Sequence, residues 1–242
     1  MPDMNTKYDP DGISMLWFDL DDTLWDMSGN SVICLRRMYD SENLGQYFES
    51  PEQWDEIYHE INFSLWEQYG RGAISREYLR DERFARPLRQ VGVDPQTALR
   101  LAKRFDPLYL DLLGRQAGLV DGCIDLLDYL SDRGYRMGIC SNGFREVQYN
   151  KLRSSGIYSY FDKIILSDDA GVNKPACGFF DYAADEAGTT GASNLLVGDN
   201  LTTDIMGALA AGWMAIWYAP GQHQTADGIT TVVSLRQLRD IL

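Results

Sequence analysis

Histidine and paired cysteines, the usual ligands of zinc and the usual parts of many catalytic triads, are scarce in this 242-residue sequence. Its two histidines, His59 and His223, are far apart, which argues against a zinc site and against a triad built on histidine. Its four cysteines are scattered and form no CxxC pair, as expected for reduced thiols in a cytoplasmic protein. Any chemistry in this chain must therefore rely on carboxylates.

Positive charge is also scarce, because 22 Lys and Arg residues stand against 36 Asp and Glu residues, a formal net charge of −14. Such a field repels nucleic acid polymers and anionic lipid, so we expect neither as a partner. A small phosphorylated substrate remains compatible with this charge if a lysine or a metal ion concentrates positive charge locally. The oligomeric state is not indicated by the sequence.

Long apolar segments are missing too. The longest weakly polar run, residues 205–218, is interrupted by glycine and is shorter than the roughly 20 apolar residues of a membrane span. The polar start of the chain lacks the apolar segment of a signal peptide. We therefore expect a cytoplasmic protein with no membrane partner.

Short apolar runs alternate with helical patterns along most of the chain. Strands are predicted over residues 13–20, 135–140, 164–166, 195–197, 213–218 and 229–233. Helices are predicted between them over residues 121–133, 146–155 and 178–187. Nearly continuous apolar strands that alternate with helices are typical of a parallel sheet covered on both faces. The sequence thus predicts a doubly wound, mostly parallel, Rossmann-like α/β core.

The interval from residue 27 to residue 114 breaks this alternation, because it contains helical patterns and no convincing strand. Helix starts are predicted at three capping residues: Ser50, which opens a capping box with Gln53, then Ser75 and Asp94. The aromatic stripe of the helix that ends at Gly70 is interpreted as bundle core rather than a ligand cage. The predicted organisation is an α/β catalytic core of residues 1–26 and 115–242, with an all-helical cap domain of residues 27–114 inserted after the first strand.

Polar residues gather where the predicted strands end, which is where open α/β sheets bind ligands. They are Asp19-Leu20-Asp21-Asp22-Thr23 after the first strand, Ser141-Asn142-Gly143 after the second, Lys174 in the loop after the third, and Gly198-Asp199-Asn200 with Asp204 after the fourth. Crowded carboxylates raise one another's pKa unless a cation lies among them. Oxygen ligands without histidine or cysteine suit Mg²⁺. Each cluster alone is an ordinary turn or strand end, but the combination favours a functional site.

These four clusters resemble the ordered motifs of the haloacid dehalogenase superfamily: DxDxT, a strand-terminal Ser or Thr, a lysine, and a late GDxxxxD. They occur in order between residue 13 and about residue 218, with the helical insert where that family places its C1-type cap. The segments FDLDDTLWD, SNG and GDNLTTD are most similar to the nucleoside 5′-monophosphate phosphatases, the pyrimidine 5′-nucleotidase-like branch. One departure is Ala176-Cys177, where relatives often carry Asp-Pro after the lysine and proline.

The resemblance implies a role for each motif residue. Asp19 would be the nucleophile that forms an aspartyl-phosphate, and Asp21 the general acid and base. Phosphoryl oxygens would be bound by Ser141, by Asn142 through its backbone and by Lys174. Mg²⁺ would be held by Asp19, the backbone carbonyl of Asp21, Asp199 and Asp204, the last directly or through water.

The expected function is Mg²⁺-dependent hydrolysis of a small phosphate monoester, with a nucleoside 5′-monophosphate as the best guess. A phosphosugar phosphatase or mutase of the same superfamily, a 2-haloacid dehalogenase and a non-catalytic protein that binds phosphate or Mg²⁺ remain alternatives. Asp21 favours phosphoryl chemistry, because by the same resemblance dehalogenases lack an aspartate at this position. They have no alkoxide to protonate.

Overall fold

The computed structural model describes residues 12–221 and 228–242, and the chain divides into two compact units. The first unit contains the chain up to Asp26 and from Ala117 to Leu242, and the second contains Met27 to Gln116. The polar start of the chain and His223 lie outside the described residues. None of the helices in the described ranges is both long and apolar enough to cross a membrane.

The first unit is built on six parallel strands, in the order β3-β2-β1-β4-β5-β6. The strands are β1 (Met15–Phe18), β2 (Met137–Ser141), β3 (Lys163–Leu166), β4 (Asn194–Gly198), β5 (Met214–Tyr218) and β6 (Thr230–Val232). The predicted α/β fold, with a parallel sheet and a helical insertion after the first strand, is confirmed. Because β1 pairs with both β2 and β4, the order of the strands reverses beside β1, and the loops that leave β1 and β4 diverge at that point.

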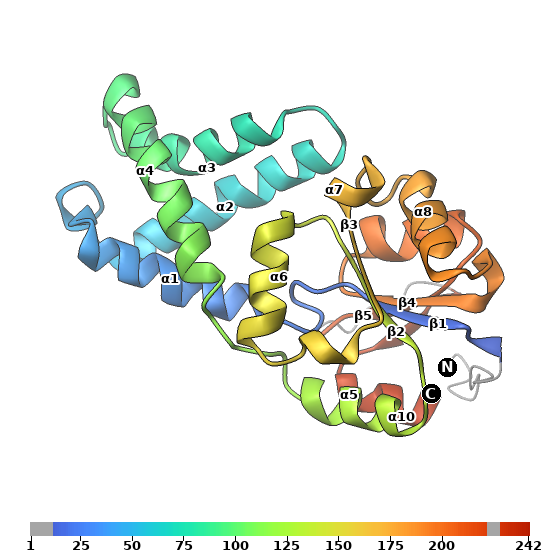
Figure 1. The fold of residues 1–242 in the computed structure, drawn as a ribbon. Coiled ribbons are helices and arrows are strands. Elements are labelled where there is room, and N and C mark those ends of the chain that lie inside the picture. The colour runs from blue at the N-terminus through green and yellow to red at the C-terminus, as the bar shows by residue number, and fades with distance from the viewer. Residues whose placement is uncertain (1–11, 222–227) are drawn as a thin grey trace. The chain divides into compact units, whose positions relative to one another are not determined.

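Helices cover both faces of this sheet. They are α5 (Cys123–Asp132), α6 (Arg145–Ser154), α7 (Ser167–Ala170), α8 (Cys177–Ala187), α9 (Gly207–Ala210) and α10 (Leu238–Ile241), with a π-helical turn η5 (Leu201–Met206) and short 3-10 turns η3 (Tyr158–Tyr160), η4 (Gly191–Ser193) and η6 (Leu235–Gln237). A buried cluster joins Phe179 and Phe180 of α8 to Trp17 of β1 and Leu196 of β4 on one face. Helices α5 and α10 lie together on the opposite side of the sheet from α8 (Figure 1).

The second unit is helical. It contains α1 (Met27–Ser41), the 3-10 turn η2 (Leu44–Gln46), α2 (Pro51–Gly70), α3 (Arg76–Gln90) and α4 (Pro95–Leu113). The three predicted helix starts are confirmed, because the side chains of Ser50, Ser75 and Asp94 accept hydrogen bonds from backbone N–H groups in the first turn. The predicted capping box does not close, because the Gln53 side chain accepts from the backbone N–H of Glu49 instead of Ser50.

Aromatic residues form much of the core of the helical unit. The ring of Tyr58 lies 5.0 Å from that of Phe84 and 5.5 Å from that of Tyr109, measured between centroids. Trp54 and Leu65, which belong to the predicted stripe of α2 together with Tyr58, are also fully buried. The other members of the stripe are half-buried: Ile57, Ile61, Trp66 and Tyr69. The stripe therefore packs as core along its centre only. That this unit serves as a substrate-covering cap stays a prediction.

Candidate active site

Three carboxylates meet at the edge of the sheet where β1 and β4 end. Asp19 directly follows β1 and Asp199 directly follows β4, and the two parallel strands are neighbours. Asp204, from the π-helical turn η5, completes a group in which one oxygen of each side chain lies within 4.8 Å of the others. Gly198 allows this approach, because a Cβ atom there would lie 2.5 Å from Oδ2 of Asp204. The predicted convergence of these three residues is therefore present in the structure.

Lys174 lies inside this carboxylate group. Its side chain is 2% exposed, and its Nζ lies 2.7 Å from Oδ1 of Asp19 and 2.7 Å from Oδ1 of Asp204. The same ammonium donates a hydrogen bond of 2.7 Å to the carbonyl oxygen of Cys140, in β2. All three protons of the ammonium thus have acceptors inside the protein.

The loop that carries Lys174 is held by Asn142. The backbone N–H of Lys174 donates to Oδ1 of Asn142 at 2.8 Å, and Nδ2 of Asn142 donates back to the carbonyl of Lys174 at 3.0 Å. Asn142 therefore aligns the end of β2 with the lysine loop through its side chain, a contact that the sequence did not predict. The departure at Ala176-Cys177 leaves Lys174 within the carboxylate group.

The electrostatics of the group are those of an acidic site with one internal cation. Burial raises the pKa of Asp19 well above its usual range, Lys174 opposes this, and the neighbouring carboxylates of Asp204, Asp199 and Asp21 raise the pKa further. Burial, with Asp204 and Asp22, raises the pKa of Asp199 to about 7. Burial alone would lower the pKa of Lys174, but Asp19 and Asp204 overcome it and raise the pKa. One ammonium among three carboxylates leaves an excess of negative charge, which favours binding of a further cation.

The donor set of this group fits Mg²⁺. It offers carboxylate oxygens and contains no histidine or cysteine, which is the ligand chemistry of hard divalent cations. Thr23 orients one of these carboxylates, because the backbone N–H of Asp199 donates to Oγ1 of Thr23 at 3.1 Å and that hydroxyl donates back to Oδ1 of Asp199 at 3.3 Å. Thr23 is fully buried and thus fixes the loop after β1 to the end of β4.

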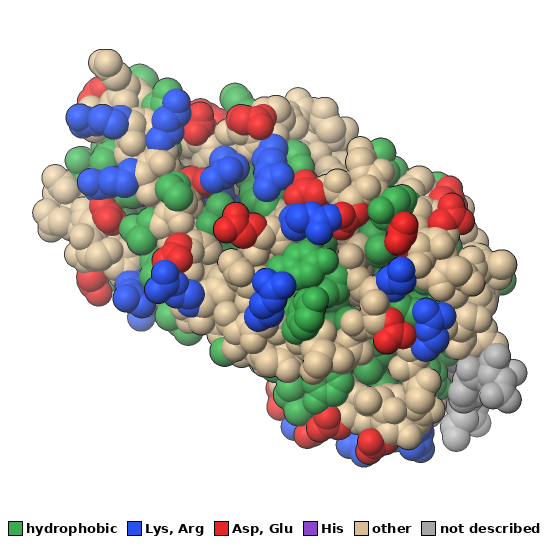
Figure 2. Space-filling model, in the orientation of Figure 1, with side chains coloured by type: hydrophobic (Ala, Val, Ile, Leu, Met, Phe, Trp, Pro, Cys, Tyr) green, Lys and Arg blue, Asp and Glu red, His purple; other side chains and the backbone are tan. Residues whose placement is uncertain are grey.

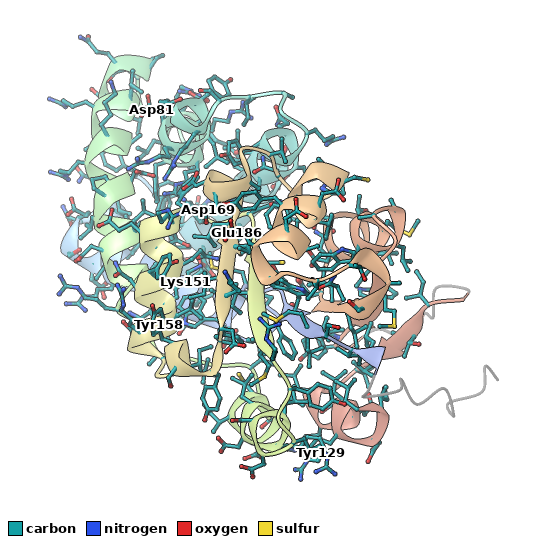
Figure 3. The ribbon with its side chains drawn as sticks, turned by 45° about the vertical axis from the view of Figure 1, so that its right-hand side comes forward. Asp81, Tyr129, Lys151, Tyr158, Asp169 and Glu186 are labelled. Carbon is teal, nitrogen blue, oxygen red and sulfur yellow. The ribbon has the colours of Figure 1, made fainter. Side chains whose placement is uncertain are left out.

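Asp21 has different partners. Among the described residues its carboxylate is not part of the three-carboxylate group, and it contacts two side chains of α6 instead. Nζ of Lys151 lies 2.6 Å from Oδ1 of Asp21, and Nε2 of Gln148 donates to Oδ2 at 2.9 Å. The Lys151 side chain is 3% exposed, and its ammonium lies 4.6 Å from the ring centroid of Trp25. Lys151 and Gln148 were not predicted as site residues; Figure 3 labels Lys151 on α6.

Ser141 is connected to Asp21 through the same glutamine. Nε2 of Gln148 also donates to Oγ of Ser141 at 2.7 Å, and the backbone N–H of Gly143 donates to this oxygen at 3.1 Å. Both contacts use the serine oxygen as acceptor, so neither uses its hydroxyl proton. The predicted residues thus form two linked clusters, one around Lys174 and one around Gln148.

Comparison with known proteins identifies the family. The model of haloacid dehalogenase-like hydrolases matches residues 16–218. HAD-hydrolase YfnB of Bacillus subtilis (strain 168) is 30% identical over 227 residues, which cover 93% of this chain and 92% of YfnB. The pyrimidine 5′-nucleotidase PynA of Streptococcus pneumoniae is 30% identical over 231 residues, with 94% of each chain covered. The pyrimidine 5′-nucleotidase YjjG of Escherichia coli (strain K12) is 29% identical over 231 residues, with 94% of this chain and 96% of YjjG covered.

The fold agrees with that of one of these relatives. The crystal structure of YfnB bound to magnesium aligns with a TM-score of 0.82 at 28% identity, and the alignment covers 95% of this chain and 98% of that one. The predicted resemblance is confirmed, since both the family model and the relatives span most of the sequence. This chain therefore belongs to the haloacid dehalogenase-like hydrolases, a family of enzymes.

Proposed function

We propose that this enzyme is a Mg²⁺-dependent phosphatase that hydrolyses a small phosphate monoester through an aspartyl-phosphate intermediate. The preferred substrate that we propose is a nucleoside 5′-monophosphate. The observation that carries the proposal is the placement of Asp19, a carboxylate at the end of β1, against the buried Lys174 and beside Asp199 and Asp204. This arrangement places a nucleophile beside an ammonium and a set of Mg²⁺ donors, the two sources of positive charge that a phosphate ester would meet here. The nucleotide is suggested by two relatives named as pyrimidine 5′-nucleotidases that match nearly the whole chain.

The charge distribution supports a small substrate over a polymer. On the face shown in Figure 2, the described Lys and Arg side chains are interspersed with Asp and Glu and do not merge into one basic surface. The net charge of −14 opposes binding of a phosphate backbone. At the end of β1, the buried Lys174 and a Mg²⁺ ion held by the carboxylates would supply the positive charge that a small phosphate ester needs.

In the proposed reaction, a carboxylate oxygen of Asp19 attacks phosphorus and the bond from phosphorus to the ester oxygen breaks. Asp21 gives a proton to the leaving alkoxide, and in the second step it takes a proton from the water that hydrolyses the aspartyl-phosphate. A Mg²⁺ ion would offset the negative charge that the nucleophile and the substrate bring together. It would be held by Asp19, Asp199, Asp204 and the backbone carbonyl of Asp21.

The phosphoryl oxygens would be bound by Ser141, Lys174 and the backbone of Asn142. The Ser141 hydroxyl fits this role, because its oxygen already accepts from Gln148 and Gly143 and its proton can be donated to a phosphoryl oxygen. Lys174 would compensate charge on the transferring group while it keeps its contact with Asp19.

The test is phosphate release from p-nitrophenyl phosphate and from a panel of nucleoside monophosphates and sugar phosphates, with Mg²⁺ or with EDTA. We expect release that requires Mg²⁺ and is fastest with a nucleotide, and we expect Asp19→Asn to abolish it in a folded protein. Isomerised phosphate ester without free phosphate would indicate a mutase, and halide release from a 2-haloacid would indicate a dehalogenase. Unchanged substrates throughout would indicate a binding protein, and each of these three results contradicts the proposal.

A further inference from the structure

We infer that Lys151 and Gln148 are positioning residues that set the orientation of the Asp21 carboxylate for proton transfer. The inference rests on the proposed phosphatase function and concerns a pair of α6 residues outside the four family motifs. Lys151 contacts Oδ1 of Asp21 and Gln148 contacts Oδ2, so each oxygen of this carboxylate has its own donor. Two donors on two oxygens fix the rotation of a carboxylate in a way that a single donor does not.

Both donors come from one rigid element. Residues 148 and 151 are three apart in α6, so their side chains project from the same face of the helix. They are almost completely buried, whereas the side chain of Asp21 is 30% exposed. The half-exposed carboxylate is thus oriented by two donors that packing holds in place.

The loop after β1 and the loop after β2 are both adapted to this contact. Trp25 presents its ring to the Lys151 ammonium, and the backbone N–H of Asp22 donates to the carbonyl of Trp25 at 2.8 Å, so the loop folds back around Asp21. A Cβ atom at Gly143 would lie 2.4 Å from the Gln148 side chain, so the glycine makes room for it. Burying an ammonium is costly unless it is paired, and here its partner is Asp21.

A positioning role makes a specific kinetic prediction. Transfer of a proton from Asp21 matters most when the leaving group is an alkoxide, as with a sugar or nucleoside hydroxyl, and least with p-nitrophenolate, which is stable as an anion. The ratio kcat/KM covers the steps up to leaving-group departure. Loss of the orientation of Asp21 should therefore lower kcat/KM for alkyl phosphates and spare it for p-nitrophenyl phosphate. A residue that acts only on folding or on phosphate binding would lower both equally.

The experiment measures kcat/KM for p-nitrophenyl phosphate and for the alkyl phosphate that the wild-type chain hydrolyses fastest. Removing the Lys151 donor, in Lys151→Met, should lower kcat/KM for the alkyl ester about 10- to 100-fold, part of the usual contribution of acid–base catalysis, and should change the aryl ester less than about threefold. Gln148→Met should lower the alkyl ester more than the aryl ester, with some loss for both, because Gln148 also donates to Oγ of Ser141. Lys151→Arg, which keeps a cation, should stay close to wild type. Lys163→Met is the matched control. It removes a lysine of β3 whose Nζ lies 3.6 Å from the Glu186 carboxylate, and it should leave kcat/KM unchanged for both esters.

A double-mutant cycle tests whether Lys151 acts through Asp21. In an Asp21→Asn background, Lys151→Met should cause little further loss with the alkyl ester, because the group that Lys151 orients is already gone. If the wild-type chain hydrolyses both esters, three results for Lys151→Met would overturn the inference: an equal loss with both esters, no loss with either, or a full additional loss in the Asp21→Asn background. A wild-type chain that hydrolyses neither ester would instead overturn the proposed function, and the inference with it.

Discussion

Replacement of Lys174 by methionine should destabilise this protein much more than the loss of an ordinary lysine. Its ammonium has acceptors at 2.7 Å on Asp19, Asp204 and the carbonyl of Cys140, and the side chains of the two aspartates are 11% and 2% exposed. Methionine has a similar length but no charge, so Lys174→Met leaves two buried carboxylates without the cation between them. Removing one partner of a buried ion pair typically costs about 3–5 kcal/mol.

The cost should depend on pH in a direction that the structure fixes. Burial and the neighbouring carboxylates already raise the pKa of Asp19 even though Lys174 opposes them, and the loss of Lys174 removes that opposition. Where Asp19 is protonated, at low pH, it loses little without the lysine, whereas at high pH it is charged and lies unpaired beside the other carboxylates. The free-energy difference between wild type and Lys174→Met should therefore grow as the pH rises.

The measurement is urea unfolding followed by tryptophan fluorescence in EDTA, at about pH 5 and about pH 8. Lys163→Met serves as the control, because Lys163 and Glu186 are partly exposed and 3.6 Å apart, and such pairs contribute about 0–1 kcal/mol. If the three carboxylates hold Mg²⁺, its addition should recover part of the loss in Lys174→Met. If Lys174→Met lowers the free energy of unfolding at the higher pH by no more than Lys163→Met does, the view that Lys174 balances the charge of the three carboxylates is refuted.

Two other predictions concern the same carboxylates. In calorimetric titrations, the affinity for Mg²⁺ should rise as the pH passes through about 7, because protons compete for Asp199 below that pKa; an affinity that is flat with pH would contradict its role as a ligand. Gly198→Ala should cost about 1–3 kcal/mol in urea unfolding and weaken Mg²⁺ binding, because the new Cβ would lie 2.5 Å from Asp204. Gly178→Ala in α8 is the control, because a Cβ atom there would meet only Val172, at 3.7 Å, and the substitution should be neutral or slightly stabilising. Equal effects of the two substitutions would show that Asp204 moves aside at no cost.

Features with a local cause could be predicted from the sequence. The strands are short apolar runs, and the helix starts at Ser50, Ser75 and Asp94 depend on contacts within one helical turn. The meeting of Asp19 and Asp199 is not local in sequence, but it follows from one rule of topology. The carboxyl ends of neighbouring parallel strands lie at the same edge of a sheet, so residues that directly follow β1 and β4 must come together.

Contacts that depend on how side chains pack were not predicted. The resemblance assigned Asn142 a backbone role in phosphate binding, whereas in the structure its side chain also holds the Lys174 loop. The missing closure of the capping box at Ser50 has a similar origin, because Gln53 can reach either of two adjacent backbone N–H groups and takes that of Glu49. In both cases the residue type permits several partners, and the fold selects one of them.

The two α6 residues show what signal the sequence did contain. Gln148 is adjacent to Val147 and Lys151 to Leu152, and all four are buried, so the polar pair lies on the face of the helix that packs against the protein. A polar donor on a buried helix face needs an acceptor, because an unpaired buried ammonium or amide is costly. Since α6 begins shortly after Ser141, an acceptor at the carboxyl end of the sheet is the nearest choice, and Asp21 supplies it with both oxygens. Polar donors three residues apart on the buried face of a helix that follows a motif strand therefore indicate an acceptor at the carboxyl end of the sheet.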